Sequence, residues 1–155
     1  MGAMPEPVTV WKVDLVRGVP PVEVRGTLSM TDEGVVFEPD EGAAVTRIAF
    51  TEAARVKRLR GSPVLVIQKT ARGAGATAFY FAEPPPLHPA DPATLSLRDA
   101  GPPSPLAATR RPSERRHRRQ NAGYLASKGR MLKPTLHAWA SEIRAGIETA
   151  RRGRG

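Results

Sequence analysis

The stretch Pro134-Thr-Leu-His-Ala-Trp-Ala-Ser-Glu-Ile-Arg-Ala-Gly-Ile147 predicts an amphipathic helix, because its large apolar residues recur every three or four positions. With one residue just before it, the stretch forms a single stripe of Leu132, Leu136, Trp139, Ile143 and Ile147. Pro134 suits the first turn of a helix, where a missing N–H costs no hydrogen bond. Arg151 and Arg152 suit the negative C-terminal pole, and Gly153 favours a stop.

The chain before this helix is predicted to form short β-strands. Trp11, Val13 and Leu15 alternate with polar residues, which predicts a half-buried strand over 8–17 with Trp11 facing the core. Strands over 22–30 and 35–37 form a hairpin through the turn residues 31–34. Further strands are expected at 45–50, 55–60, 64–67 and 77–82.

Seven closely spaced strands are typical of an all-β sandwich or barrel. We expect a mainly β domain closed by the C-terminal helix. The predicted structural core comprises Trp11, Leu28, Phe37, Leu136, Trp139, Ile143 and Ile147.

Length and composition indicate one domain with appendages. The 155 residues include no cysteine, which excludes disulfides and thiolate metal sites and fits a reducing cytoplasm. No apolar run approaches the roughly 20 residues of a membrane span, and no secretion signal is visible. We expect a cytoplasmic protein that can be peripheral at the membrane. Abundant Arg, Ala, Gly and Pro suggest GC-rich coding and a bacterial source.

The net charge of +9 is unevenly distributed. Residues 1–83 hold ten basic and ten acidic side chains, whereas residues 110–155 hold thirteen basic and three acidic ones. The predicted β region is therefore neutral, and the positive excess belongs to the C-terminal third. An electrostatic partner is expected to meet that part of the chain.

Between the last strand and the helix the composition changes. Nine prolines fall between Pro84 and Pro112, which predicts a proline-rich linker over 84–112. Ser113 can cap a basic helical segment over 113–128, and Gly129 is expected to break it. Residues 1–7 and 151–155 are expected to be disordered ends.

The arginine-rich segment carries the candidate residues for binding an anionic surface. It lacks an apolar face for membrane insertion, but it can lie on anionic headgroups, on nucleic-acid phosphates or on an acidic protein. A solvated basic loop without a specific role is the plain alternative. No aromatic residue interleaves with the arginines, so base readout is not indicated. The candidates are Arg110, Arg111, Arg115, Arg116, Arg118, Arg119, Lys128 and Arg130.

Two stretches resemble the pleckstrin-homology-like (PH-like) superfold, which includes the PH and GRAM domains. Residues Gly26-Thr-Leu-Ser-Met-Thr-Asp-Glu-Gly-Val-Val-Phe37 resemble the early hairpin of GRAM-type members, and 136–147 resemble the closing PH helix. The resemblance covers 8–82 together with 130–150. It implies a binding module. The insertion before the helix is long, which leaves open whether the helix packs on its own chain or swaps onto a second copy.

The resemblance also places possible ligand-facing residues on the early strands. Phosphoinositide-binding PH domains use a lysine on the first strand and two basic residues, spaced by one, on the second. Lys12 matches the first and Arg25 the last, but Glu23 stands where the other cation is expected. A carboxylate repels phosphate, so the best-known lipid site of the superfold is not implied.

No catalytic, cofactor or metal site is predicted. The three histidines, His88, His117 and His137, lack the converging ligands that a metal needs, and no serine lies in a nucleophile elbow. We expect a non-enzymatic binding or adaptor module that recognises a protein or an anionic membrane component. The alternatives are nonspecific nucleic-acid binding through the arginines, and a protein-interaction domain whose basic loop is neutral.

Overall fold

The structure is a computed structural model that describes residues 3–84 and 111–155, with side chains from position 121 onward in the second range. Seven antiparallel strands form one sheet in the order β4-β3-β2-β1-β7-β6-β5, which confirms the predicted mainly β fold. The strands are β1 (Val8–Leu15), β2 (Glu23–Met30), β3 (Gly34–Pro39), β4 (Thr46–Ala49), β5 (Ala53–Arg58), β6 (Val64–Lys69) and β7 (Ala76–Tyr80). Two helices follow, α2 (Arg111–Met131) and α3 (Lys133–Arg152).

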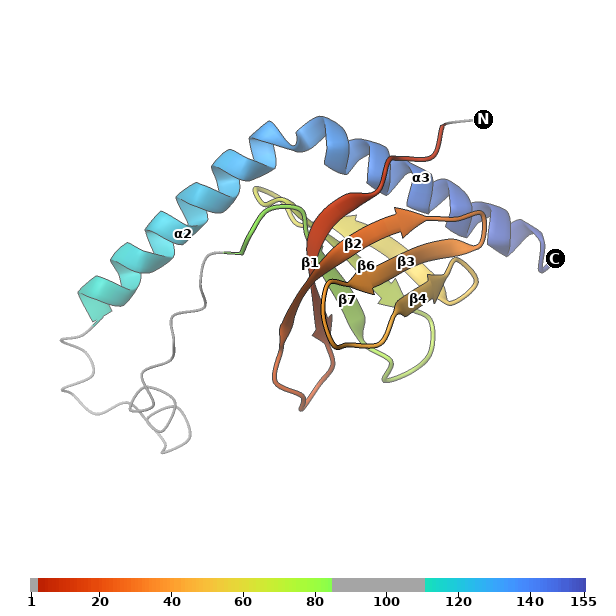
Figure 1. Cartoon of the computed structure of the whole chain (residues 1–155), viewed down its shortest axis with the longest axis horizontal. Helices are drawn as coiled ribbons and strands as arrows, with labels where there is room; N and C mark the ends of the chain where they lie inside the picture. The colour runs from red at the N-terminus through yellow and green to blue at the C-terminus, as the bar shows by residue number, and fades with distance from the viewer. Residues whose placement is uncertain (1–2, 85–110) are drawn as a thin grey trace.

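The sheet curves until its two halves face each other, and α3 lies along one side of it (Figure 1). The β1–β2, β3–β4 and β6–β7 connections lie on the side away from α3, at the bottom of Figure 1. We call this side the loop end. One apolar core contains residues from every strand and from α3, as expected of a sandwich.

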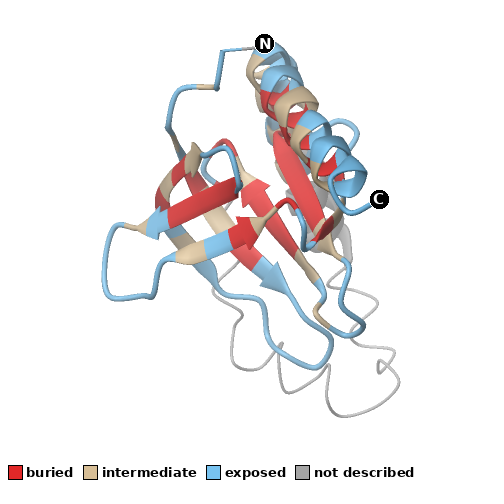
Figure 2. Ribbon diagram, turned by 90° about the vertical axis from the view of Figure 1, so that its right-hand side faces the viewer, coloured by how far each residue is buried: buried red, intermediate tan, exposed pale blue. Residues whose placement is uncertain are grey.

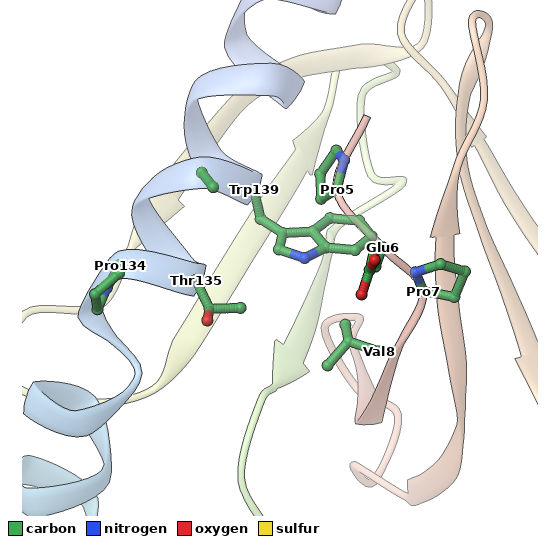
Figure 3. A pocket seen from close by; sticks show the side chains of 8 residues that line it. Pro5, Glu6, Pro7, Val8, Pro134, Thr135 and Trp139 are labelled. Atoms are coloured by element: carbon green, nitrogen blue, oxygen red, sulfur yellow. The ribbon is translucent and has the colours of Figure 1, made fainter. Parts of the chain in front are cut away.

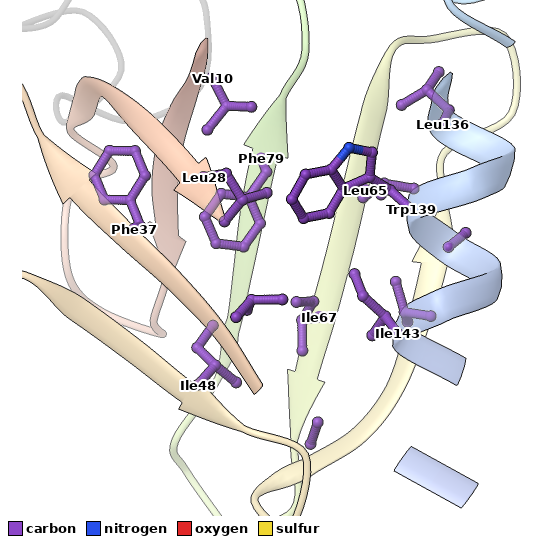
Figure 4. Packing of buried hydrophobic residues seen from close by; sticks show 14 of the residues in the cluster. Val10, Leu28, Phe37, Ile48, Leu65, Ile67, Phe79, Leu136, Trp139 and Ile143 are labelled. Carbon is purple, nitrogen blue, oxygen red and sulfur yellow. The ribbon is translucent and has the colours of Figure 1, made fainter. Parts of the chain in front are cut away.

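The predicted apolar stripe is the face that α3 buries (Figure 2). Leu136, Trp139, Ile143 and Ile147 are all nearly inaccessible to solvent. The Trp139 ring meets the Phe81 ring edge-on at 5.9 Å between centroids and lies near Leu65 and Phe79 in Figure 4. Edge-to-face packing suits the quadrupoles of two aromatic rings. Trp139 therefore joins the helix to the sheet, as the sequence predicted.

The strand β1 presents the opposite face to the one predicted. Val10 is fully buried in the core, whereas Trp11 is only partly buried and pairs with Tyr80 on the outer face. The prediction of Trp11 as a core residue is wrong because β1 carries apolar residues on both faces. The outer face has its own small cluster, formed by Val13, Val64, Val66 and Ala78.

The helices α2 and α3 are nearly continuous, with a bend between them (Figure 1). The backbone N–H of Leu132 still donates to the Lys128 carbonyl oxygen at 2.9 Å. Pro134 has no N–H to donate to the preceding turn, which accounts for the bend.

Gly129 does not break the helix, contrary to the prediction, since α2 continues to Met131. Its lack of a side chain lets α2 approach the β5–β6 turn, because a Cβ there would lie 3.0 Å from the Ser62 carbonyl carbon. The Arg58 guanidinium donates to the Gly129 carbonyl oxygen at 2.9 Å. The direction of α2 is therefore fixed by the sheet at this point.

The C-terminal residues are more ordered than the predicted disordered tail. Arg151 and Arg152 belong to α3, and Arg151 donates to the carbonyl oxygen of Ala54. Arg154 donates to the Thr51 carbonyl oxygen at 2.8 Å. These contacts tie the end of the helix to the β4–β5 region. The predicted linker lies mostly outside the described residues, but 111–112 belong to α2.

Replacing Trp139 tests whether α3 closes the core. Trp139→Ala is expected to lower the free energy of unfolding by about 3–5 kcal/mol, because it removes a fully buried ring and leaves a cavity. Chemical denaturation measures the change. The exposed His137 on the same helix provides a control, and His137→Ala is expected to leave stability nearly unchanged. Equal stability of the two variants would contradict this role of Trp139.

Candidate functional site

The loop end carries a group of exposed apolar side chains. In the described part of the chain, five of the nine large apolar side chains that are exposed lie there: Leu15, Val16, Val19, Val22 and Val45. Val19 is 57% exposed and Val22 is 67% exposed. Four of the five flank or belong to the β1–β2 connection. We call these four, Leu15, Val16, Val19 and Val22, the apolar loop.

The surroundings of the apolar loop are basic in part. Arg17 lies within it and is exposed, and the β6–β7 connection contributes the exposed Arg72. That connection is held beside the loop by the pairing of Leu15 with Ala76. Contiguous exposed apolar groups on a folded domain mark an interaction surface more often than isolated ones do. This surface was not predicted, because Gly18-Val-Pro-Pro21 is typical of a turn, although Leu15-Val16 and Val19-Pro-Pro-Val22 already show the apolar residues.

Lys12 lies between the two halves of the sheet at the loop end. Its ammonium donates to the Asp14 carboxylate at 3.0 Å and to the Thr46 hydroxyl at 2.9 Å, and it lies 5.6 Å from the centroid of the Phe37 ring. The Lys12 side chain is only 12% exposed. The buried Thr77 hydroxyl donates to the other carboxylate oxygen of Asp14 at 3.1 Å. Lys12 thus joins β1 to β4 and has its charge balanced by Asp14.

Arg25 lies on the outer face of β2. Its guanidinium forms a 2.6 Å ion pair with Asp40 and lies 5.8 Å from the centroid of the Trp11 ring. Lys12 and Arg25 therefore point to opposite faces of the sheet. The structure does not bring these two predicted ligand-facing residues together.

Glu23 is partly buried and lies near Glu83, and both conditions affect the pKa of its carboxyl group. Partial burial raises the pKa of the Glu23 carboxyl above its ordinary value, and the charge of Glu83 raises it further. Burial, and then the charge of Glu23, raise the pKa of the Tyr80 hydroxyl. These groups make the outer face acidic beside Trp11, which does not favour phosphate there.

The predicted basic residues fall mostly on α2. The N-terminal half of this helix holds Arg111, Arg115, Arg116, Arg118 and Arg119, whose side chains lie outside the described part. Arg110 lies entirely outside it. Lys128 and Arg130 are in its last turn. The Lys128 ammonium lies 5.9 Å from the centroid of the Tyr124 ring, and Arg130 is exposed.

The described residues contain neither a candidate metal site nor a helix that could span a membrane. Among the side chains described, those of 3–84 and 121–155, no group of three or more His, Asp or Glu could hold a metal ion. No helix within 3–84 or 111–155 is long and apolar enough to cross a bilayer. His137 is exposed on α3, whereas His88 and the side chain of His117 lie outside the described part. No model of a known protein family matches the chain, and no curated protein sequence matches it.

The raised pKa of Glu23 predicts a pH-dependent effect on stability. A carboxyl whose pKa is higher in the folded state stabilises the fold below its unfolded pKa, and this contribution is lost as the pH rises through the folded pKa. Glu23→Gln is therefore expected to raise the melting temperature at pH 7 and to leave it unchanged near pH 3.

Thermal melts of both proteins at the two pH values measure this difference. Glu41→Gln, on the exposed β3–β4 connection, removes the same charge and corrects for the overall positive charge of the chain. A Glu23→Gln gain at pH 7 no larger than that of Glu41→Gln would contradict the raised pKa of Glu23.

Proposed function

We propose that this chain is a non-enzymatic adaptor module of PH-like fold that attaches to an anionic membrane surface. The apolar loop and the arginines of α2 make the two contacts. The observation that carries the proposal is the exposure of Leu15, Val16, Val19 and Val22 together at the loop end. The seven-stranded sheet and the helix that packs on it through Trp139 support the PH-like assignment.

Two modest attractions combine in this proposal. Burying a valine side chain fully in an apolar environment is worth about 1.5–3 kcal/mol, so a loop with four exposed apolar side chains gains from entering the interfacial region. Each basic residue near an anionic surface adds about 1 kcal/mol. Membrane anchoring commonly needs two such signals, because one alone is reversible and weak.

The placement of α2 allows both contacts at once. From its junction with α3, α2 extends away from the sheet to the lower left of Figure 1, so its arginine-rich N-terminal end points toward the level of the loop end. A flat surface can then approach the loop and the helix end together. Arg17 and Arg72 add charge next to the loop itself.

The proposed recognition is of surface charge rather than of one phosphorylated headgroup. Lys12 is already bound to Asp14 and Thr46, and Arg25 is paired with Asp40. Neither cation can bind phosphate without losing these partners. A stereospecific site would also have to accommodate the carboxylate of Glu23 on the same strand as Arg25.

Nonspecific nucleic-acid binding is the second candidate, favoured by the arginines of α2 alone. Phosphates of a duplex attract these cations through counterion release, as headgroups do. The exposed valines of the loop end gain nothing from a duplex, which favours the membrane. A mobility shift of random duplex at low salt that is lost on deletion of 110–119, with no binding to anionic vesicles, would establish the nucleic-acid function instead.

Loop variants test the membrane proposal directly. The wild-type chain is expected to sediment with anionic phosphatidylglycerol vesicles and not with neutral phosphatidylcholine vesicles. Val19→Asp/Val22→Asp is expected to weaken the binding at least tenfold, because it puts carboxylates where apolar groups enter the interface. Both positions are exposed, so the melting temperature should not change.

Met131 supplies the matched control, since it is 65% exposed but lies at the junction of α2 and α3. Met131→Asp should retain vesicle binding. Equal loss in both variants, or binding that ignores the loop change, would contradict insertion of the apolar loop.

Neutralising the helix tests the second contact. Replacing Arg115, Arg116, Arg118 and Arg119 with Gln is expected to flatten the salt dependence of vesicle binding, because fewer cations then meet the headgroups. Titration with sodium chloride at fixed vesicle concentration measures the slope. An unchanged slope would show that α2 does not contribute.

A further inference from the structure

A groove runs between the start of α3 and the N-terminal segment of the chain (Figure 3). It contains a pocket of about 500 Å³. Pro5, Glu6, Pro7 and Val8 line one side of the pocket, and Pro134, Thr135, Ala138 and Trp139 line the other. Glu6 is its one charged residue, so the carboxylates of an acidic partner have to lie away from the pocket, toward α2. The walls are mainly apolar, and the volume is in the range of pockets that take large side chains or small ligands.

An apolar stripe on the helices leads into this pocket. Tyr124, Met131 and Ala138 are seven residues apart, so they share one helix face. We call these three residues the docking stripe. The backbone hydrogen bond from Leu132 to Lys128 and the one from Leu136 to Leu132 link α2 to α3 at the bend, where Met131 lies.

All three residues of the docking stripe are exposed. Met131 is 65% exposed and Tyr124 is 38% exposed. Ala138 is exposed as well, directly beside the buried Trp139. Exposed apolar groups beside an apolar pocket mark an interaction surface, and an amphipathic helix can dock on such a surface.

The orientation of this surface is set by contacts of the fold. The Arg58 guanidinium holds the Gly129 carbonyl oxygen, and Gly129 packs against the backbone of Ser62. The last turn of α2 is therefore fixed relative to the pocket. A partner does not have to order this surface on binding, which lowers the entropic cost of association.

The charges around the docking stripe indicate the chemistry of the partner. Lys128 lies over the Tyr124 ring, Arg130 is exposed in the same turn, and Lys133 is exposed at the start of α3. We propose that the groove binds an acidic amphipathic helix of a partner protein. An apolar side chain of that helix fills the pocket, its apolar face covers Met131 and Tyr124, and its carboxylates meet Lys128 and Arg130.

Two other occupants fit less well. A second copy packed antiparallel about Met131 would bring the cations of Lys128, Arg130 and Lys133 close to their own counterparts. A bilayer covers protruding groups, whereas this pocket is an open depression between α3 and residues 5–8. The proposal does not depend on membrane attachment, which uses the loop end.

A designed peptide tests the groove in the full chain. The probe is a labelled 18-residue helix with leucines along one face and glutamates elsewhere, and fluorescence anisotropy measures its binding. A peptide with lysines in place of the glutamates and an equally long polyglutamate are the controls. We expect micromolar binding of the leucine–glutamate peptide and binding at least tenfold weaker of both controls.

Reciprocal variants locate the binding and separate it from membrane attachment. Met131→Glu is expected to weaken peptide binding at least tenfold and to leave vesicle binding intact. Val22→Glu is expected to weaken vesicle binding and to leave peptide binding intact. No peptide binding, equal binding of polyglutamate, or full binding by Met131→Glu would overturn the proposal. A dimer in sedimentation equilibrium that Met131→Glu dissolves would overturn it in favour of a second copy.

Discussion

The packing of Trp139 between α3 and the sheet is the contact on which the rest of the structure depends. The ring meets Phe81, which follows the last strand, so it joins segments separated by nearly sixty residues of sequence. Gly146 allows the same helix to approach Phe50, because a Cβ there would lie 2.4 Å from that ring. Once α3 is seated, Pro134 and Gly129 determine where α2 points. The basic segment is thus carried by a helix whose direction follows from the core.

This arrangement gives the molecule two surfaces of different character. The loop end presents valines and arginines on short connections, with Lys12 and Asp14 balancing each other between the halves of the sheet. The other surface is a recessed apolar groove beside Trp139, continued by the docking stripe along α2. The first suits a flat anionic surface and the second suits a folded partner. A module with both could bring an acidic protein to a membrane.

Much of the fold follows from local patterns, whereas the surfaces do not. Helical spacing identified Leu136, Trp139 and Ile143 because only one face of that helix is apolar. Leu28 was predicted as a core residue on β2, where Val24, Leu28 and Met30 alternate with polar residues and again only one face is apolar. That rule fails on β1, because Val10 and Trp11 place apolar side chains on opposite faces of the strand. Which of the two faces the core depends on how the strand sits in the sheet. The prediction that Gly129 breaks the helix was wrong, because this glycine serves a close approach to Ser62, which is a tertiary contact. The apolar loop and Val45 come to one end of the sheet, and Ala138 comes to face Pro5, only after folding.

The proposed membrane contact can be tested by NMR of the full chain on anionic bilayer discs that contain a lipid with a paramagnetic headgroup. Attachment through the loop end predicts the strongest broadening of backbone amide signals at Val16, Val19 and Val22, weaker broadening in the β6–β7 connection, and none at Ser62 or Ala138. Broadening centred on the β5–β6 turn or on the groove beside Trp139, with the β1–β2 connection unaffected, would contradict it.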